Sequence, residues 1–80
     1  MFYRVWHVWE DKIGKHTYHE EVGSVKLGYL LIEARAATQV DADNIMWNAF
    51  GLEEWVQDEW EEWYSPDGDD LDDYAEKMGW

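Results

Sequence analysis

A chain of 80 residues without cysteine has room for one domain, stabilised by neither a disulfide nor a thiolate metal site. Its 19 acidic and 6 basic residues give a net charge of −13, which argues against binding to nucleic acid or an anionic membrane and indicates a cationic partner. The sequence shows neither a signal-peptide pattern nor the roughly 20 apolar residues that cross a bilayer. We therefore expect a soluble protein of the cytoplasm.

The first two elements are predicted to be strands joined by a hairpin loop. Residues 2–9 are rich in β-formers and apolar on both alternating faces, which is typical of an interior strand covered on both sides. Residues 10–15 are polar and contain a glycine, which favours a loop. Residues 16–22 then predict a partner strand at the edge of the sheet. The faces of the first strand are Tyr3, Val5 and Trp9 on one side and Phe2, Trp6 and Val8 on the other.

A helix is predicted from Ser24 to Gln39. Ser24 is a natural N-cap, and apolar residues follow it at steps of three and four, which predicts one stripe packed against a sheet. Gly28 costs up to about 1 kcal/mol relative to alanine inside a helix, and a glycine there allows the helix to approach the sheet closely. The predicted stripe is Leu27, Leu30, Leu31, Ala34, Ala37 and Thr38.

Residues 40–44 are predicted to be a polar connection, and residues 52–64 fit two structures. As strands, residues 52–56 and 59–64 pair about a turn at Gln57-Asp58. As a helix, their apolar residues fall on one face with a period of 3.6 residues. Aromatic density favours the strands and the run of glutamates favours the helix, while the turn lacks an Asn-Gly or Asp-Gly signature.

The last element is predicted to be a short helix after a turn at Ser65-Pro66-Asp67-Gly68. Asp70 is its N-cap, and Gly79 ends it. The apolar positions of this helix are Leu71, Tyr74, Ala75 and Met78. The sequence thus predicts a single α+β domain over residues 1–80. An antiparallel sheet of about four strands carries the main helix on one face, with the short helix at the C-terminus.

The negative charge lies in the second half of the chain. Residues 1–40 hold five acids and five bases, whereas residues 41–80 hold fourteen acids and one base, Lys77. A solvated face or a disordered acidic tail would carry the same charge. Disordered acidic segments are poor in aromatic residues, but here aromatic residues are interleaved with the acids, so we expect a folded acidic surface. These aromatic residues are Trp47, Phe50, Trp55, Trp60, Trp63, Tyr64, Tyr74 and Trp80.

Few residues are candidates for catalysis or metal binding. His16 and His19 are three apart, so on a strand they point to opposite faces. The aspartates of residues 67–73 resemble those of a calcium-binding loop. Counted from Asp67, however, Asp72 occupies the sixth position, where that loop requires glycine, and Met78 the twelfth, where it requires glutamate. The sequence has no cysteine nucleophile and no Gly-rich phosphate loop. We expect no enzymatic activity, no cofactor and no dedicated metal site.

Carboxylates are predicted to form the binding surface. Strand residues i and i+2 project the same way, about 6.6–6.8 Å apart. Glu59 and Glu61 would therefore form a row that Glu53 extends from the partner strand. The C-terminal helix would continue it with Asp69, Asp70, Asp72, Asp73 and Glu76. A rigid array of this kind can occupy a groove built for phosphates. The predicted partner-binding residues are Glu53, Glu54, Asp58, Glu59, Glu61, Glu62, Asp69, Asp70, Asp72 and Asp73.

Three segments together carry a resemblance to known proteins. They are Phe2-Tyr3-Arg4-Val5-Trp6-His7, Gly51-Leu52-Glu53-Glu54-Trp55 and Glu59-Trp60-Glu61-Glu62-Trp63-Tyr64-Ser65-Pro66-Asp67-Gly68-Asp69-Asp70. The pattern resembles small acidic proteins of bacteriophages and prophages, some of them labelled superinfection-exclusion proteins. Those proteins usually carry a glycine in the turn that is Gln57-Asp58 here. In size, acidity and lack of a catalytic signature, the chain also looks like phage anti-CRISPR proteins, in particular those that bind type I Cascade complexes.

The resemblance implies an inhibitor in the cytoplasm of a host cell. It would bind the basic, nucleic-acid-binding surface of a host defence complex, with type I Cascade favoured, and block target DNA by acidic, DNA-like contacts. The alternative is a phage accessory protein of the superinfection-exclusion kind that docks through aromatic residues, with acidity serving solubility. In either case we expect no direct contact with nucleic acid or membrane, and a monomer or small homo-oligomer.

Overall fold

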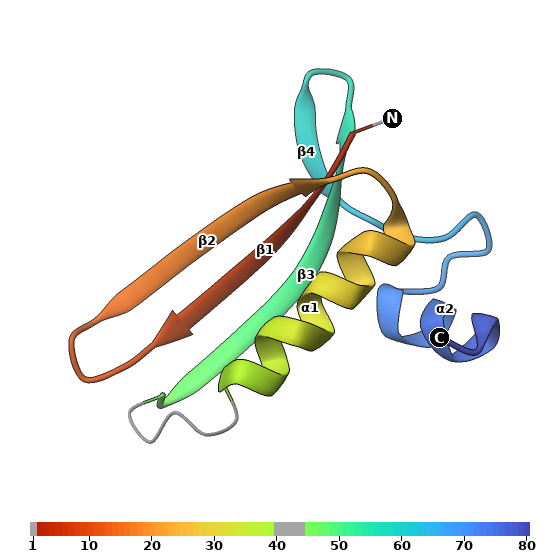
Figure 1. The fold of residues 1–80 in the computed structure, drawn as a ribbon. Coiled ribbons are helices and arrows are strands. Elements are labelled where there is room, and N and C mark those ends of the chain that lie inside the picture. Colours follow the sequence, from red (N-terminus) through yellow and green to blue (C-terminus); the bar gives the residue numbers. More distant parts are fainter. Residues whose placement is uncertain (1, 40–44) are drawn as a thin grey trace.

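The computed structural model describes residues 2–39 and 45–80, and Figure 1 shows a twisted sheet with a helix across one face. The elements are β1 (Tyr3–Glu10), β2 (Lys15–Val22), α1 (Val25–Gln39), β3 (Trp47–Val56), β4 (Glu59–Glu62) and α2 (Leu71–Met78). The four strands form one antiparallel sheet in the order β2-β1-β3-β4. This confirms the predicted α+β fold. The predicted connection over residues 40–44 lies outside the described residues.

The central strand β1 has one covered face and one open face. It pairs with β2 on one edge and β3 on the other, and on the face toward α1 its residues Val5 and His7 are fully buried. Among the described elements no helix covers the opposite face (Figure 1), so the prediction that both faces are covered is wrong. The indole of Trp6 lies there directly over Gly51, where a Cβ atom would overlap it. Apolar residues on this face are thus shielded by neighbouring strands.

The orientation of α1 differs from the predicted stripe, although its start agrees with the prediction. The Oγ of Ser24 accepts a hydrogen bond from the backbone N–H of Leu27 at 3.1 Å, as expected of an N-cap. Gly28 faces the sheet, where a Cβ atom would lie 2.7 Å from Cδ1 of Leu52, so the predicted close approach is confirmed. Leu27 and Leu30, however, are 54% and 49% exposed.

The apolar stripe that meets the sheet is rotated about the helix axis relative to the prediction. Val25, Leu31 and Ile32 pack against the core, and with Gly28 they lie three or four positions apart, on one helix face. Of the six residues predicted for the stripe, only Leu31 packs against the core cluster. Gly28 accounts for the difference, because a residue without a side chain does not count in a hydrophobic pattern although it faces the sheet closely.

Residues 52–64 form a hairpin, so the alternative of a helix is wrong. Gln57 and Asp58 have φ values of 50° and 66°, as a two-residue turn with both central residues left-handed requires. Residues 47–54 of β3 pair with β1, whereas β4 pairs only with residues 53–56. Pairing with the central strand outweighs the helix propensity of the glutamates, because strand formation depends on cross-strand and same-face neighbours.

The C-terminal segment agrees with the prediction. The N–H of Gly68 donates to the carbonyl of Ser65 at 2.9 Å in the turn, and Gly79 ends α2 with a left-handed φ of 74°. Val5, Leu52 and Trp63 form the central cluster of buried residues, Ala75 of α2 is also buried, and the ring of Tyr74 meets Trp63 edge to face. The short helix is thus anchored to the sheet through aromatic contacts.

Candidate acidic binding surface

The β3–β4 hairpin places three glutamates on one face. Glu54 lies directly opposite Glu61, and Glu59 projects the same way as Glu61, two residues earlier on β4. We call these three residues the acidic row. Like charges directly opposite each other destabilise a strand pair. Within the described ranges the ion pairs reach only Asp11, Glu53 and Asp69, so no cation is paired with the acidic row.

Glu53 does not belong to the acidic row, which corrects the predicted geometry. Neighbouring strand residues project to opposite faces, so Glu53 lies on the open face of the sheet, opposite Glu62. It accepts a hydrogen bond from Nε of Arg4 at 2.7 Å, and the guanidinium carbon of Arg4 lies 4.5 Å from the centroid of Trp60. The charge of Glu53 is therefore balanced within the protein, and Glu54 takes the place predicted for it.

Glu62 lies opposite Glu53 on the hairpin and is also close to Asp70 and Asp72 at the start of α2. Its Oε2 accepts a hydrogen bond from Nε1 of Trp6 at 3.1 Å. Loss of surrounding water raises the pKa of Glu62 and the charge of Glu53 adds to the rise, whereas the hydrogen bond from Trp6 acts in the opposite direction. Glu62 lines a groove of about 440 Å³ together with Asp70 and Asp72.

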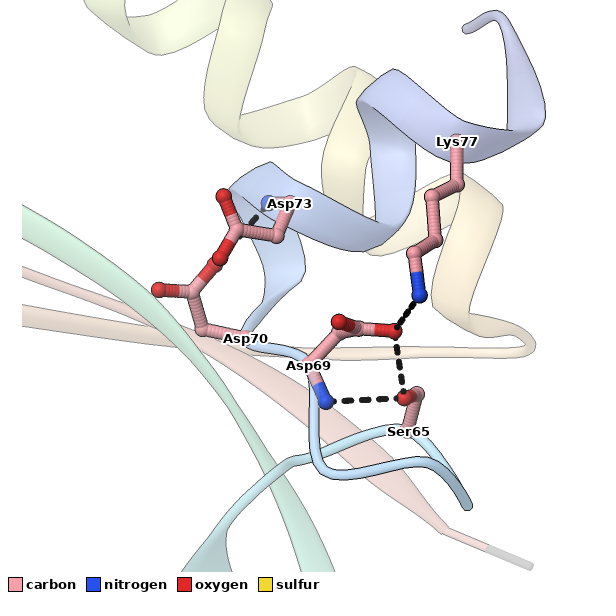
Figure 2. A network of polar contacts seen from close by, with 5 residues as sticks. All are labelled: Ser65, Asp69, Asp70, Asp73 and Lys77. Atoms are coloured by element: carbon pink, nitrogen blue, oxygen red, sulfur yellow. Dashed lines mark hydrogen bonds and ion pairs between the residues drawn. The ribbon is translucent and has the colours of Figure 1, made fainter.

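Asp69 and Asp70 hold the C-terminal segment together, as Figure 2 shows. Oδ2 of Asp69 accepts hydrogen bonds from Nζ of Lys77 at 2.8 Å and from Oγ of Ser65 at 3.3 Å. The hydrogen bond from Lys77 is the main reason that the pKa of Asp69 lies below its ordinary value. Oδ1 of Asp70 accepts from the backbone N–H of Asp73 at 2.9 Å, as an N-cap does. Both carboxylates thus have partners within the chain.

The ten predicted partner-binding residues therefore divide into separate groups. The hairpin carries the acidic row with Asp58 at its turn, and this turn lies at one end of the sheet, apart from α2 (Figure 1). The first turn of α2 carries Asp72 and Asp73, both exposed. The structure does not join these groups into one continuous array. The predicted residues with contacts inside the protein are Glu53, Glu62, Asp69 and Asp70.

Sequence reasoning did not identify two features of the surface. Glu33 of α1 lines the same groove as Glu62 and Asp70, but nothing in its local pattern places it near them. Trp47 and Trp55 lie on the open face of the sheet, 42% and 39% exposed. The sequence left open whether residues 52–64 form strands or a helix. Which side chains of β3 point to the open face could therefore be assigned only after the strand was known.

The histidines project as their spacing predicts. His16 stacks on Trp9 on the face toward α1, with ring centroids 5.1 Å apart, whereas His19 lies opposite Trp6 on the open face. In the described part of the chain, no three histidine, aspartate or glutamate side chains are arranged to hold a metal ion.

Comparison with known proteins adds no family. The chain matches no protein-family model, no curated protein and no solved structure. Neither helix in the described ranges has the length and apolar character needed to cross a lipid bilayer.

The acidic row gives a first testable prediction, on stability. Glu61→Gln is expected to raise the free energy of unfolding by about 0.2–1 kcal/mol, because it removes the repulsion from Glu54 across the strands. Urea denaturation of the purified variant measures the change. Glu53→Gln, the same chemical change on the open face, is expected to give no gain, because it also removes the ion pair with Arg4. Equal gains in both variants would contradict the assignment of the faces.

Proposed function

We propose that this protein is a non-enzymatic inhibitor that binds a basic, nucleic-acid-binding surface of a larger complex and excludes nucleic acid from it. The observation that carries the proposal is the acidic row, in which Glu54, Glu59 and Glu61 share one face of a hairpin and have no ion-pair partner among the described residues. Such a cluster lowers the stability of the free protein. A cationic partner would supply the missing countercharge, so binding would relieve the repulsion.

The hairpin is suited to present these charges in a fixed arrangement. Its strands are joined by a tight turn, and the rings of Trp55 and Trp60 meet edge to face, with centroids 5.2 Å apart. A preorganised surface loses little conformational entropy on binding. The net charge of −13 attracts a basic surface at long range and speeds association. The acidic row thus combines the sign of a phosphate chain with a rigid support.

The resemblance to phage anti-CRISPR proteins makes a type I Cascade complex the first target to test. The inhibitor would then act in the cytoplasm of the host cell and occupy the channel that receives target DNA. It would contact the protein surface of the complex and not the nucleic acid itself, since both carry the same sign of charge.

The test is a competition experiment with purified Cascade and labelled target DNA. The triple variant Glu54→Gln, Glu59→Gln, Glu61→Gln is expected to inhibit DNA binding roughly tenfold less well, because three partly exposed ion pairs of about 0.2–1 kcal/mol each are lost. Its inhibition is also expected to depend less on salt concentration. Circular dichroism checks that the variant is folded.

A matched control removes the same number of charges from α2. The variant Asp72→Asn, Asp73→Asn, Glu76→Gln has the same net charge as the hairpin variant and leaves the acidic row intact. It is expected to inhibit nearly as well as the native chain. Equal inhibition by the hairpin variant and the native chain, at both low and high salt, would overturn the proposal. Equal losses in the two variants would show that net charge alone acts.

The exposed tryptophans of the open face favour a second candidate, an accessory protein that docks through aromatic contacts. Trp47 donates a hydrogen bond from Nε1 to Oε1 of Glu10 at 3.0 Å, so its ring is held in place although it is 42% exposed. Aromatic residues held in this way are typical anchors of protein interfaces. In this case Trp47→Ala would abolish binding to the partner, and salt would have little effect.

A further inference from the structure

The open face of the sheet carries a second candidate site, distinct from the acidic row. A pocket of about 340 Å³ is lined by Phe2, Glu21, Trp55 and Trp60. The strand register brings them together. The backbone N–H of Trp55 donates to the carbonyl of Phe2 at 2.9 Å, Trp60 lies opposite Trp55, and Glu21 lies opposite Arg4 on the neighbouring edge strand. The pocket therefore combines residues from both edge strands of the sheet with its centre.

Aromatic rings form most of the wall. The ring planes of Trp55 and Trp60 stand 69° apart with centroids 5.2 Å from each other, so they form a corner. Phe2 adds a third ring, and it is 66% exposed. The faces of aromatic rings carry negative charge density and attract a cation within about 6 Å of the centroid. Glu21 adds a carboxylate, and no lysine or arginine is among the described residues that line the pocket.

From this geometry we propose that the pocket binds an alkylammonium cation of the size of a lysine head group or its methylated forms. A rounded ammonium group can contact both walls of a corner at once, whereas a planar guanidinium stacks on a single face. Arg4 illustrates the second case within the protein, since its guanidinium carbon lies 4.5 Å from the centroid of Trp60 while Glu53 holds its Nε. The ring of Trp60 thus already contacts one cation, Arg4. Arg4 itself is not among the residues that line the pocket.

The site does not depend on the proposed inhibition. The acidic row projects from the opposite face of the hairpin, since Glu54 and Trp55 are neighbours on one strand. Cation binding can therefore be measured on the free protein with small probes and no partner complex. Failure of either proposal leaves the other standing.

The test is an NMR titration of the full chain labelled with ¹⁵N. The indole N–H signals of Trp55 and Trp60 are followed as choline or its uncharged isostere 3,3-dimethylbutan-1-ol is added. Choline is expected to give saturable shifts of both signals and to bind roughly tenfold more tightly than the isostere, as a cation–π site predicts. The signal of Trp47, on the same face but outside the pocket, is expected to stay in place.

Three variants and a second pair of probes complete the experiment. Trp55→Ala is expected to lose saturable binding, and Trp47→Ala to retain it. Glu21→Gln, at an exposed edge-strand position, is expected to weaken choline binding severalfold without altering binding of the isostere. Trimethyllysine compared with lysine shows whether the methylated group is preferred. Equal affinity for choline and the isostere would overturn the proposal, as would the absence of saturable shifts or equal losses in Trp55→Ala and Trp47→Ala.

Discussion

Leu52→Ala is expected to lower the free energy of unfolding by about 3 kcal/mol, because it leaves a cavity in the buried core. Leu52 is 1% exposed and belongs to the buried cluster with Val5 and Trp63. It also lies against Gly28 of α1, where an added Cβ atom would be only 2.7 Å from Cδ1 of Leu52. In a domain of this size 1 kcal/mol shifts the melting temperature by about 4–8 °C, so a fall of about 12–24 °C is expected. Thermal denaturation followed by circular dichroism measures it.

Leu27→Ala is the matched control, because it is the same chemical change at a residue that the hydrophobic pattern assigns to the core. The structure leaves Leu27 54% exposed. The expected loss is therefore at most about 0.5 kcal/mol, as for other surface substitutions. A loss as large as that of Leu52→Ala would mean that α1 packs through the stripe predicted from sequence and not through the face that contains Gly28.

The free energy of unfolding is expected to fall as the pH is lowered from 7 toward 5, because His7 resists protonation in the folded state. His7 is fully buried on β1, and its Nδ1 accepts a hydrogen bond from Nε of Arg35 at 3.2 Å. Its Nε2 has no partner among the described residues. Phe50 stacks on the ring with centroids 4.0 Å apart, and Tyr18 lies opposite on β2. Burial first, and the charge of Arg35 second, lower the pKa of His7 below 6.5.

The sign of the pH effect follows from where the proton binds. In the unfolded chain His7 takes up a proton near its ordinary pKa of about 6.5, whereas the folded protein does so only at lower pH. Between these two pKa values the unfolded state binds more protons, so stability decreases as the pH falls. The slope can reach about 1.4 kcal/mol per pH unit. Above pH 7 His7 is neutral in both the folded and the unfolded state, so it no longer makes the stability depend on pH.

Urea denaturation at pH 7, 6 and 5 measures this dependence in the native chain and two variants. His7→Gln keeps an acceptor for Arg35 but does not titrate, so it is expected to lose most of the slope. His19→Gln, on the open face of the sheet, is expected to keep it. An unchanged slope in His7→Gln would contradict the prediction. An NMR titration provides a second check, since an ordinary pKa for His7 in the folded protein would also contradict it.

Local features of the fold could be predicted because they depend on neighbours in the sequence. Ser24 and Asp70 cap helices through hydrogen bonds to backbone groups three residues later, and Gly79 ends α2 in a conformation that glycine adopts readily. The polar loop containing Gly14 and the β-forming residues of β1 predict the first hairpin in the same way. The acidic second half and its interleaved tryptophans were also evident from composition.

The tertiary structure alone decided which of these residues act together. Pairing of β3 with β1 made residues 52–56 a strand, although the local pattern fitted a helix equally well. The register of β3 and β4 then placed Glu54, and not Glu53, with Glu59 and Glu61. Close approach at Gly28 turned the leucines of α1 outward. These outcomes depend on contacts between distant segments, where a shift of one residue moves every side chain to the other face. The sequence by itself determined the amount of charge and every element except residues 52–64, whereas packing determined that these residues form a hairpin and which charges share a surface.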